Sequence, residues 1–357
     1  MFFSKQKTNM ELEIIEQTKI IPYILMKYIN HENSEIKIEL PQNVRKIVLV
    51  ASGSSYHCAR FAVELLEKFS NIESRAIYSS EFLLKSVIPH DENTLYIFIT
   101  QSGETSDTVK SVEKVKSTAP LATLCITNKE NSTIWNLCDY KVACFAGKEQ
   151  GIAATKSFTA QMLCLILISL KLIENVHGME ATKHYKDSLM RLPIVLEKAL
   201  ARRKEIKKLA SKLAKEKTII MTADGISYSL AKEAALKTKE TSYKNISAAI
   251  LGEFMHGHVA VLNNKSTLVY IAVDKIPERS VNNLLKIKKD YNPKLLIIGE
   301  SDERLNPDWN INIECENEIQ QMFANVLICQ QLALEIALKL HRNVDHPKGL
   351  NKVVIDK

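Results

Sequence analysis

Two short loops rich in hydroxyl side chains are the first feature of this sequence that could do chemistry. One loop is Ser52-Gly53-Ser54-Ser55 and the other is Thr100-Gln101-Ser102-Gly103-Glu104-Thr105. Each follows an apolar run typical of a buried strand and precedes a segment with helical spacing. Because the start of a helix offers unpaired N–H groups and a partial positive charge, both loops are suited to phosphate.

Two interpretations of these loops compete. Serine and threonine commonly cap helix N-termini, and a single loop would favour that simpler role. Two such loops in succession, with Gln101 between their hydroxyls, favour a phosphate site in which Ser54, Ser55, Ser102 and Thr105 donate hydrogen bonds. The matching place in the second half is occupied by residues 273–277, Val-Asp-Lys-Ile-Pro, so we expect one phosphate site per chain.

A second group of reactive side chains lies on a helix expected to begin near Ser227. Glu233, Lys237 and Glu240 are spaced i, i+4, i+7 and share one helix face. Carboxylates beside an ammonium could remove a proton next to a carbonyl group. The spacing alone, however, favours an exposed ladder of salt bridges.

Two histidines follow in the segment Gly252-Glu253-Phe254-Met255-His256-Gly257-His258. Two histidines at this spacing could bind a metal ion. No third ligand lies at a spacing typical of a metal site, so we expect no metal here. A histidine on a glycine-flanked loop is better suited to acid–base catalysis.

The elements that must position these groups alternate between strands and helices. Short apolar runs at 46–50, 94–99, 121–127 and 140–144 predict strands in the first half, and runs at 218–222, 267–273 and 295–299 predict strands in the second. Buried strands that alternate with helices indicate an α/β fold in which a doubly wound parallel sheet is flanked by helices.

The two halves share a local repeat. Ala51, Gly53, Ser55, Tyr56 and Ala59 match Ala223, Gly225, Ser227, Tyr228 and Ala231 at a constant offset of 172 residues. We interpret this as a duplicated α/β unit rather than a coincidence of small residues at strand-to-helix turns. A linker is expected near 195–215 and a long helix at about 318–340, after which Pro347 and Gly349 prevent the helix from continuing.

Composition limits the function classes. The 357 residues carry a net charge of +7, with lysines spread along the chain and only two tryptophans, which disfavours nucleic acid and suits an anionic small substrate. Seven scattered cysteines without a C-x-x-C spacing indicate a reducing compartment. The polar N-terminus and the short apolar runs predict a cytoplasmic protein without a membrane partner.

Several of these segments together resemble the sugar-isomerase (SIS) domain family, and in particular its branch formed by the isomerase halves of glutamine–fructose-6-phosphate aminotransferases. The strings that carry the resemblance occur in unbroken order from about residue 10 to the C-terminus: 13–17 (EIIEQ), 52–56 (SGSSY), 101–108 (QSGETSDT), 153–159 (AATKSFT), 235–240 (ALKTKE), 252–257 (GEFMHG) and 345–352 (DHPKGLNK).

The resemblance implies two tandem SIS domains and a C-terminal active-site tail. The expected divisions are an N-terminal helical segment at 1–42, a phosphate-binding SIS domain at 43–195, a second SIS domain at 205–340 and the tail at 341–357. It also implies a homodimer with shared active sites, a hexose 6-phosphate substrate, aldose–ketose chemistry at C1 and C2, and no metal or organic cofactor.

Roles for individual residues follow from the same resemblance. Glu240 is expected to move a proton between C1 and C2, and Glu233 and Lys237 would support the amino or hydroxyl end of the sugar. His256 would assist ring opening in the neighbouring subunit, and Lys352 would form an imine with the ketose. The residues expected to bind the phosphate are Ser54, Ser55, Thr100, Gln101, Ser102 and Thr105, and those expected to bind the rest of the sugar are Ile152, Ala154 and Asn351.

Departures from the pattern modify the expected function. Ala154, His258 and Val353 replace a serine, a proline and a serine of the aminotransferases, and no glutaminase segment precedes the first matching helix. We therefore expect a deaminase that converts glucosamine 6-phosphate to fructose 6-phosphate and ammonia. The alternatives are a deglycase acting on fructosamine 6-phosphates and a sugar-phosphate sensor without turnover.

Overall fold

The computed structural model describes residues 7–30 and 32–352, which divide into two compact units. We call them the first-sheet unit, residues 19–149, 156–190 and 351–352, and the second-sheet unit, which comprises the residues up to 18, 150–155 and 191–350. The chain therefore passes between the units several times, and the N-terminal helix α1 (Asn9–Tyr28) contributes to both.

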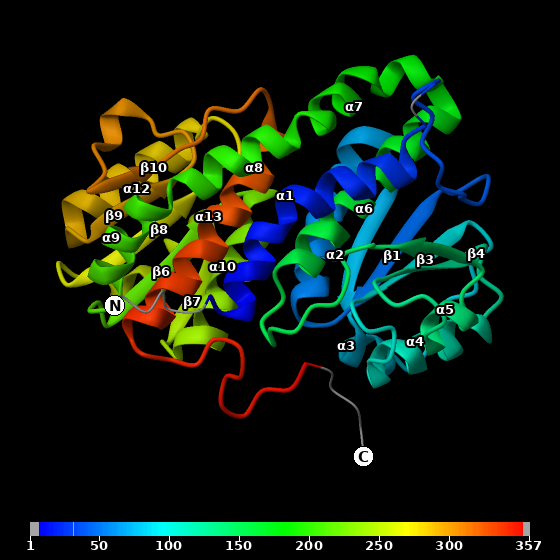
Figure 1. The fold of residues 1–357 in the computed structure, drawn as a ribbon, viewed down its shortest axis with the longest axis horizontal. Coiled ribbons are helices and arrows are strands. Elements are labelled where there is room, and N and C mark those ends of the chain that lie inside the picture. Colours follow the sequence, from blue (N-terminus) through cyan, green and yellow to red (C-terminus); the bar gives the residue numbers. More distant parts are fainter. Residues whose placement is uncertain (1–6, 31, 353–357) are drawn as a thin grey trace, which may run out of the picture. The chain divides into compact units, whose positions relative to one another are not determined.

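The first-sheet unit is a five-stranded parallel sheet with helices on both faces (Figure 1). Its order is β2-β1-β3-β4-β5, and α2 and α6 pack together on one face while α3, α4 and α5 lie on the other. The elements are β1 (Lys46–Ala51), α2 (Gly53–Ser70), β2 (Glu73–Tyr78), α3 (Ser79–Leu83), β3 (Thr94–Thr100), α4 (Ser106–Lys116), β4 (Ala122–Thr127), α5 (Thr133–Leu137), β5 (Tyr140–Ala143), α6 (Lys156–His177), η1 (Met179–Thr182) and α7 (Lys183–Met190).

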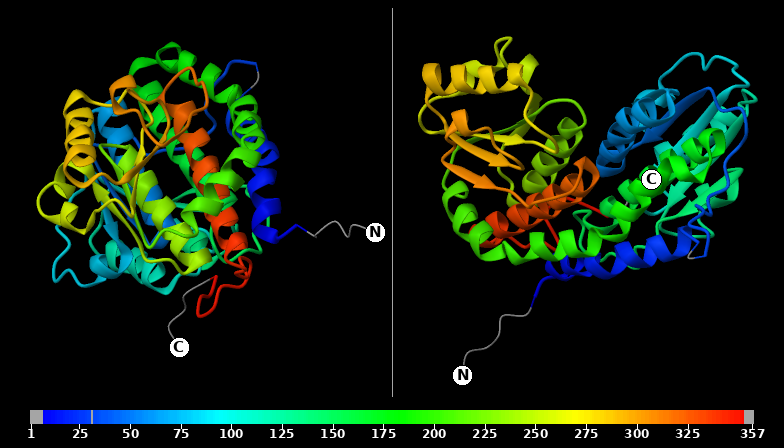
Figure 2. Two further views of the ribbon diagram at one scale, coloured as in Figure 1. Left: turned by 90° about the vertical axis from the view of Figure 1, so that its left-hand side faces the viewer. Right: turned by 90° about the horizontal axis from the view of Figure 1, so that it is seen from above.

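The second-sheet unit repeats this plan with the order β10-β9-β8-β6-β7. Figure 2 (right) shows α12 along one face of its strands and α13 along the other. The elements are α8 (Leu192–Ala201), α9 (Arg203–Leu213), β6 (Thr218–Ala223), α10 (Ser227–Ser242), β7 (Ile246–Ile250), α11 (Leu251–Phe254), η2 (His258–Val261), β8 (Ser266–Ile271), α12 (Glu278–Tyr291), β9 (Lys294–Ile298), η3 (Glu303–Leu305), β10 (Trp309–Ile311) and α13 (Glu318–Lys339).

The predicted fold class, two doubly wound parallel sheets, is confirmed. The first sheet read from its β2 edge and the second sheet read from its β7 edge have the same strand order. Strand β1 therefore corresponds to β6, and β3 corresponds to β8. Connections leave β1 and β3 in opposite directions, and a parallel sheet opens a crevice at the carboxyl ends of such a strand pair. The duplicated architecture therefore provides two candidate crevices, one in each unit.

The apolar runs predicted the central strands, and the structure adds three strands that they do not mark: β2, β7 and β10. These strands form sheet edges, where one side of the strand is not covered by a neighbour. Glu73 and Arg75 in β2 are exposed, so this strand lacks the continuous apolar character of a central strand. The linker predicted near 195–215 is helical and forms most of α8 and α9.

Two helices, α6 and α13, are long and apolar enough to cross a membrane by length and composition. In the structure, 94% of the most apolar window of each helix is buried inside the protein. Their apolar character is thus used in packing: α6 packs against α2, and α13 packs against α8, α9 and α10.

Candidate active site

The two hydroxyl-rich loops lie at the crevice of the first sheet. Strands β1 and β3 are hydrogen-bonded neighbours, with Ala51 paired to Ile99, so the loops that follow them begin side by side. Ser52 lies at the start of α2 and Thr105 at the start of α4. Both helices direct their N-terminal N–H groups to this edge, which is a favourable place for an anion.

The hydroxyl groups of these loops do not cap the two helices. Neither Ser52 nor Thr105 makes a side-chain capping hydrogen bond, although each occupies the N-cap position. The Thr105 hydroxyl instead lies 3.0 Å from the Thr100 hydroxyl, and the Ser102 hydroxyl accepts a hydrogen bond from the Glu104 N–H at 3.1 Å. Simple side-chain capping by Ser52 and Thr105 is therefore not observed, and the phosphate interpretation stays a prediction.

Tight packing fixes the second loop. Gly103 has φ +70°, and a Cβ atom at this position would lie 2.0 Å from the Ser132 Oγ and 2.4 Å from the Ser132 Cβ. The Glu104 carboxylate accepts hydrogen bonds from the Thr133 hydroxyl at 2.7 Å and the Thr133 N–H at 3.2 Å. The first of these bonds holds the pKa of Glu104 below its usual value of 4.5. The loop is therefore attached to the start of α5.

The corresponding crevice of the second sheet carries a carboxylate and a network of side-chain hydrogen bonds. Asp224 replaces Ser52, and its carboxylate accepts hydrogen bonds from the Tyr270 hydroxyl at 3.0 Å and the Ser280 hydroxyl at 2.7 Å. The Ser227 hydroxyl accepts from the Val273 N–H at 3.3 Å, which joins the two loops. A carboxylate in this place would repel a phosphate, in keeping with the expectation of one phosphate site per chain.

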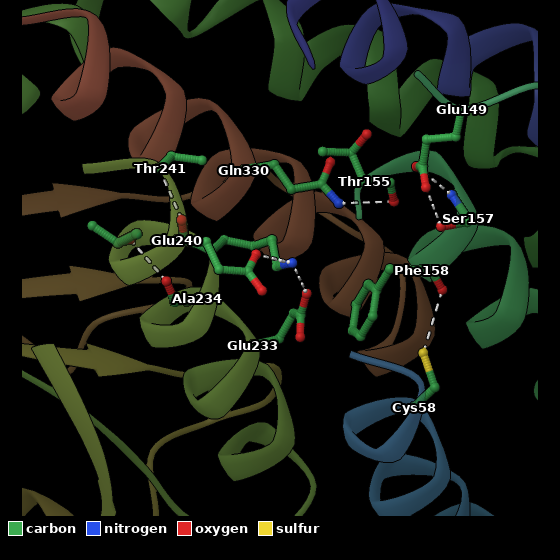
Figure 3. A network of polar contacts seen from close by, with 12 residues as sticks. Cys58, Glu149, Thr155, Ser157, Phe158, Glu233, Ala234, Glu240, Thr241 and Gln330 are labelled. Carbon is green, nitrogen blue, oxygen red and sulfur yellow. Dashed lines mark hydrogen bonds and ion pairs between the residues drawn. The ribbon is translucent and has the colours of Figure 1, made fainter. Parts of the chain in front are cut away.

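Helix α10 carries the three charged residues that its spacing singled out, of which Figure 3 labels Glu233 and Glu240. The Lys237 ammonium lies 2.5 Å from the Glu240 carboxylate and 3.5 Å from the Glu233 carboxylate. The side chains of Lys237 and Glu233 are 2% and 5% exposed, while that of Glu240 is 21% exposed. The interpretation of an exposed ladder is therefore wrong, because α13 covers this face of α10.

Burial of this cluster is costly, which makes it a candidate for catalysis. An ammonium without carboxylates would be strongly unfavourable at 2% exposure, and the two carboxylates compensate it. A cavity of about 10 Å³, which is the size of one water molecule, adjoins Glu233 and Lys237 and is also lined by Gln330. Glu240 is the most exposed member, so it is the one best placed to meet a substrate.

Loop 150–155 is held in the second-sheet unit by hydrogen bonds from three sides. The Glu13 carboxylate accepts from the N–H groups of Gln150 and Gly151. The Asp345 carbonyl accepts from the Ile152 N–H at 3.4 Å, and the Gln330 amide donates to the Thr155 carbonyl at 3.1 Å (Figure 3). The loop contains Ile152 and Ala154, the predicted contacts to the sugar.

The tail that follows α13 is attached at several points. Asp345 accepts from the N–H groups of Asn9 and Met10 at 2.8 and 2.9 Å, at the start of α1. Further along, the Lys348 N–H donates to the Tyr243 hydroxyl at 2.6 Å. Asn351 is exposed and precedes Lys352.

Lys352 lies in the first-sheet unit, and its ammonium contacts Glu149 at 2.5 Å. Val353, the predicted departure next to it, lies outside the described residues.

The two histidines of the 252–258 segment are both exposed. His256 follows α11, where its N–H donates to the Glu253 carbonyl at 2.9 Å, and Gly257 has φ +102°. Exposure makes the His256 imidazole accessible to another molecule.

A profile of the SIS domain matches residues 42–170 and again 212–340. These matches cover both sheets and more than half of the chain. The chain belongs to the SIS domain family.

Curated relatives of this SIS protein include glutamine–fructose-6-phosphate aminotransferase [isomerizing] of Aquifex aeolicus, which is 30% identical over 345 residues. Glutamine–fructose-6-phosphate aminotransferase [isomerizing] 1 of the rat, Rattus norvegicus, is 28% identical over 356 residues. The alignments cover 96% and 97% of this chain but 57% and 52% of the relatives, so the chain spans little more than half of their length.

Solved structures give the same fold. The C-terminal domain of glucosamine–fructose-6-phosphate aminotransferase from Francisella tularensis has a TM-score of 0.91 at 25% identity, and the match covers 97% of this chain and all of that one. A structure described as glucosamine-6-phosphate deaminase from Thermotoga maritima has a TM-score of 0.78 at 21% identity, covering 97% and 99% of the two chains. The second likeness shows the fold alone.

Three acidic residues that hold loops of this SIS protein belong to none of the motifs that suggested chemistry: Glu13, Glu149 and Asp345. Glu13 and Asp345 lie inside strings that carry the family resemblance, which was the available signal for them. Glu149 lies between Lys148 and Gln150, and no spacing marks it.

One feature outside the expected site is a cavity of about 920 Å³ in the first-sheet unit. Residues 35–44 and the end of α6 line it, near the amino ends of the strands, and it includes none of the predicted site residues.

Proposed function

We propose that this protein is an amino-sugar 6-phosphate isomerase and deaminase, which converts glucosamine 6-phosphate and water to fructose 6-phosphate and ammonia. The observation that carries the proposal is the buried cluster on α10, in which Glu240 is held by the Lys237 ammonium at 2.5 Å. A protein that only senses a sugar phosphate needs the phosphate loops but has no use for a buried carboxylate–ammonium–carboxylate cluster.

In the proposed mechanism, the loops after β1 and β3 bind the phosphate of the sugar. The pyranose ring opens with help from His256 of a neighbouring subunit. The Glu240 carboxylate then takes the proton from C2 of the aldehyde, which forms an enolamine. Return of this proton to C1 gives the ketose imine.

Hydrolysis completes the reaction. Water adds to C2 of the imine, and the C–N bond breaks to release ammonia and leave the ketone of fructose 6-phosphate. The Lys237 ammonium, 2.5 Å from the Glu240 carboxylate, orients that carboxylate during the two proton transfers, and Glu233 binds the same ammonium at 3.5 Å. In the proposed reverse use of the site, Lys352 forms an imine with the ketose carbonyl.

The test is a turnover assay on a panel of 6-phosphates, in which ammonia is measured for glucosamine 6-phosphate and its galacto and manno epimers, and free lysine is measured for fructoselysine 6-phosphate. Turnover of glucosamine 6-phosphate with formation of fructose 6-phosphate supports the proposal. Preference for fructoselysine 6-phosphate would identify a deglycase instead. Tight binding of a hexose 6-phosphate without any turnover would identify a sensor.

A further inference from the structure

The contact between Lys352 and Glu149 joins the tail to the first-sheet unit. The Lys352 ammonium lies 2.5 Å from the Glu149 Oε2, and the Lys352 side chain is 23% exposed. The Glu149 side chain is fully buried, which is unusual for a carboxylate and requires compensation.

Glu149 is oriented from α6. The Ser157 hydroxyl donates to Glu149 Oε2 at 2.6 Å, and the Ser157 N–H donates to Oε1 at 3.1 Å (Figure 3). Ser157 lies in the first turn of α6, where a negative charge is stabilised by the helix dipole. The carboxylate is therefore fixed before any substrate arrives, and it offers one oxygen to the lysine.

From this geometry we infer that Glu149 is the positioning residue of Lys352. It holds the last described part of the tail against the start of α6 and places the lysine nitrogen for attack on the ketose carbonyl. The inference rests on the proposed function, since it assigns a purpose to a contact of Lys352, but no sequence pattern or resemblance pointed to Glu149.

The chemistry of imine formation suits this pair. The Lys352 ammonium must first lose one proton, which the Glu149 carboxylate accepts at 2.5 Å. The amine nitrogen then bonds to C2 of the ketose, and the carbonyl oxygen leaves as water after taking up two protons. No oxidant, reductant or further reactant is required.

The inference is tested by trapping the imine. The full-length protein is mixed with fructose 6-phosphate and sodium borohydride, and the labelled lysine is identified by mass spectrometry. We expect Glu149→Gln to slow labelling of Lys352 by at least about 10-fold, because a misplaced nucleophile loses most of its proximity advantage. The KM for the sugar phosphate should stay within about 3-fold, since the phosphate loops are untouched.

Two further variants separate positioning from folding. Glu149→Asp keeps the charge and should recover part of the labelling rate, while Ser157→Ala removes one donor to the carboxylate and should give an intermediate loss. The matched control is Glu113→Gln, a change at an exposed position of α4. It should label like the wild type. If Glu149→Gln does not fold, as judged by circular dichroism, the Asp and Ala variants decide.

The outcomes distinguish this inference from the proposed function. Ammonia release with equally fast labelling of Lys352 in all three variants would overturn the role of Glu149 and leave the proposed function intact. A wild-type protein that neither releases ammonia nor forms a labelled lysine would contradict both.

Discussion

Gly103, in the proposed phosphate loop after β3, cannot be replaced by a larger residue without strain. Its φ of +70° is unfavourable for other residues, and the space for a Cβ is filled by Ser132. Gly53, in the other loop, has a φ of +55°, but nothing lies within 4 Å of its missing Cβ. Substitution of Gly53 would add backbone strain alone, whereas substitution of Gly103 would add both backbone strain and steric overlap with Ser132.

We predict that Gly103→Ala weakens binding of fructose 6-phosphate by at least about 10-fold and destabilises the protein by about 1–3 kcal/mol. Gly53→Ala, the matched control, adds backbone strain alone and should cost roughly 1 kcal/mol of the free energy of unfolding. Isothermal titration and urea unfolding measure the two effects. Equal losses in both variants would show that the Ser132 contact does not constrain the loop.

The Glu104 carboxylate makes the free energy of unfolding depend on pH. Its pKa is lower in the folded protein than its usual value of 4.5 because Thr133 donates to it. The folded state therefore favours the charged form. This contribution is fully present above about pH 4.5 and is lost as the pH falls through the lower folded pKa.

We predict that the difference in free energy of unfolding between the wild type and Glu104→Gln shrinks as the pH is lowered from 6 to about 3. Urea unfolding at several pH values measures it, with Glu113→Gln as the control for an exposed glutamate. A difference that stays constant over this range would mean that the Thr133 contact does not stabilise the carboxylate.

The spacing of Glu233, Lys237 and Glu240 correctly placed them on one helix face, but the prediction that this face is exposed to solvent was wrong. Periodicity reports which residues share a face, and it does not report what covers that face. Here the cover is α13, whose residues begin nearly 80 positions after Glu240. Such a long-range contact is not encoded in the local pattern, and only the family resemblance pointed to catalysis.

At the scale of elements, residues 13–17 of α1 hold loop 150–155, which contains the predicted sugar contacts Ile152 and Ala154. Glu13 accepts hydrogen bonds from the loop at Gln150 and Gly151, and Gln17 donates to Gln330 at 2.7 Å. Gln330 in turn holds the Thr155 carbonyl. A Cβ at Gly151 would lie 2.8 Å from the Glu13 carboxylate, so the loop approaches α1 closely.

We predict that Glu13→Ala destabilises the protein by about 1–3 kcal/mol, because it leaves two loop N–H groups without their acceptor. The kcat for ammonia release should fall, while the KM, which depends on the phosphate loops, stays within about 3-fold. Glu16→Ala provides a control on the same helix. Unchanged kcat with normal folding would show that the loop is positioned without Glu13.

The apolar runs that predicted β1, β3, β6 and β8 belong to central strands, buried on both faces. The edge strands β2, β7 and β10 were not predicted, since a strand with one open side tolerates polar residues, whereas the edge strand β5 was predicted from the apolar run at 140–144. The hydroxyl-rich loops follow central strands, so the part of the fold that positions the proposed phosphate site was predictable. The attachments through Glu13, Glu149 and Asp345 depend on residues distant in sequence and were not.

At the scale of the whole molecule, the proposed shared site predicts complementation between subunits. Glu240→Gln and His256→Ala are each expected to be nearly inactive as homodimers. Mixing them under conditions of subunit exchange should restore about a quarter of the wild-type activity, because half of the dimers are hybrids with one intact site. No recovery, despite exchange demonstrated by native mass spectrometry, would place His256 in its own subunit's site or outside catalysis.

Ammonia release by Glu240→Gln tests the central claim directly. The substitution keeps the shape of the side chain and leaves the phosphate loops intact, so binding of glucosamine 6-phosphate should be unchanged within about 3-fold. Loss of the base should lower kcat by about 10²- to 10⁴-fold. Ammonia release at the wild-type rate from saturating glucosamine 6-phosphate would contradict the assignment of Glu240 as the base, and with it the proposed mechanism.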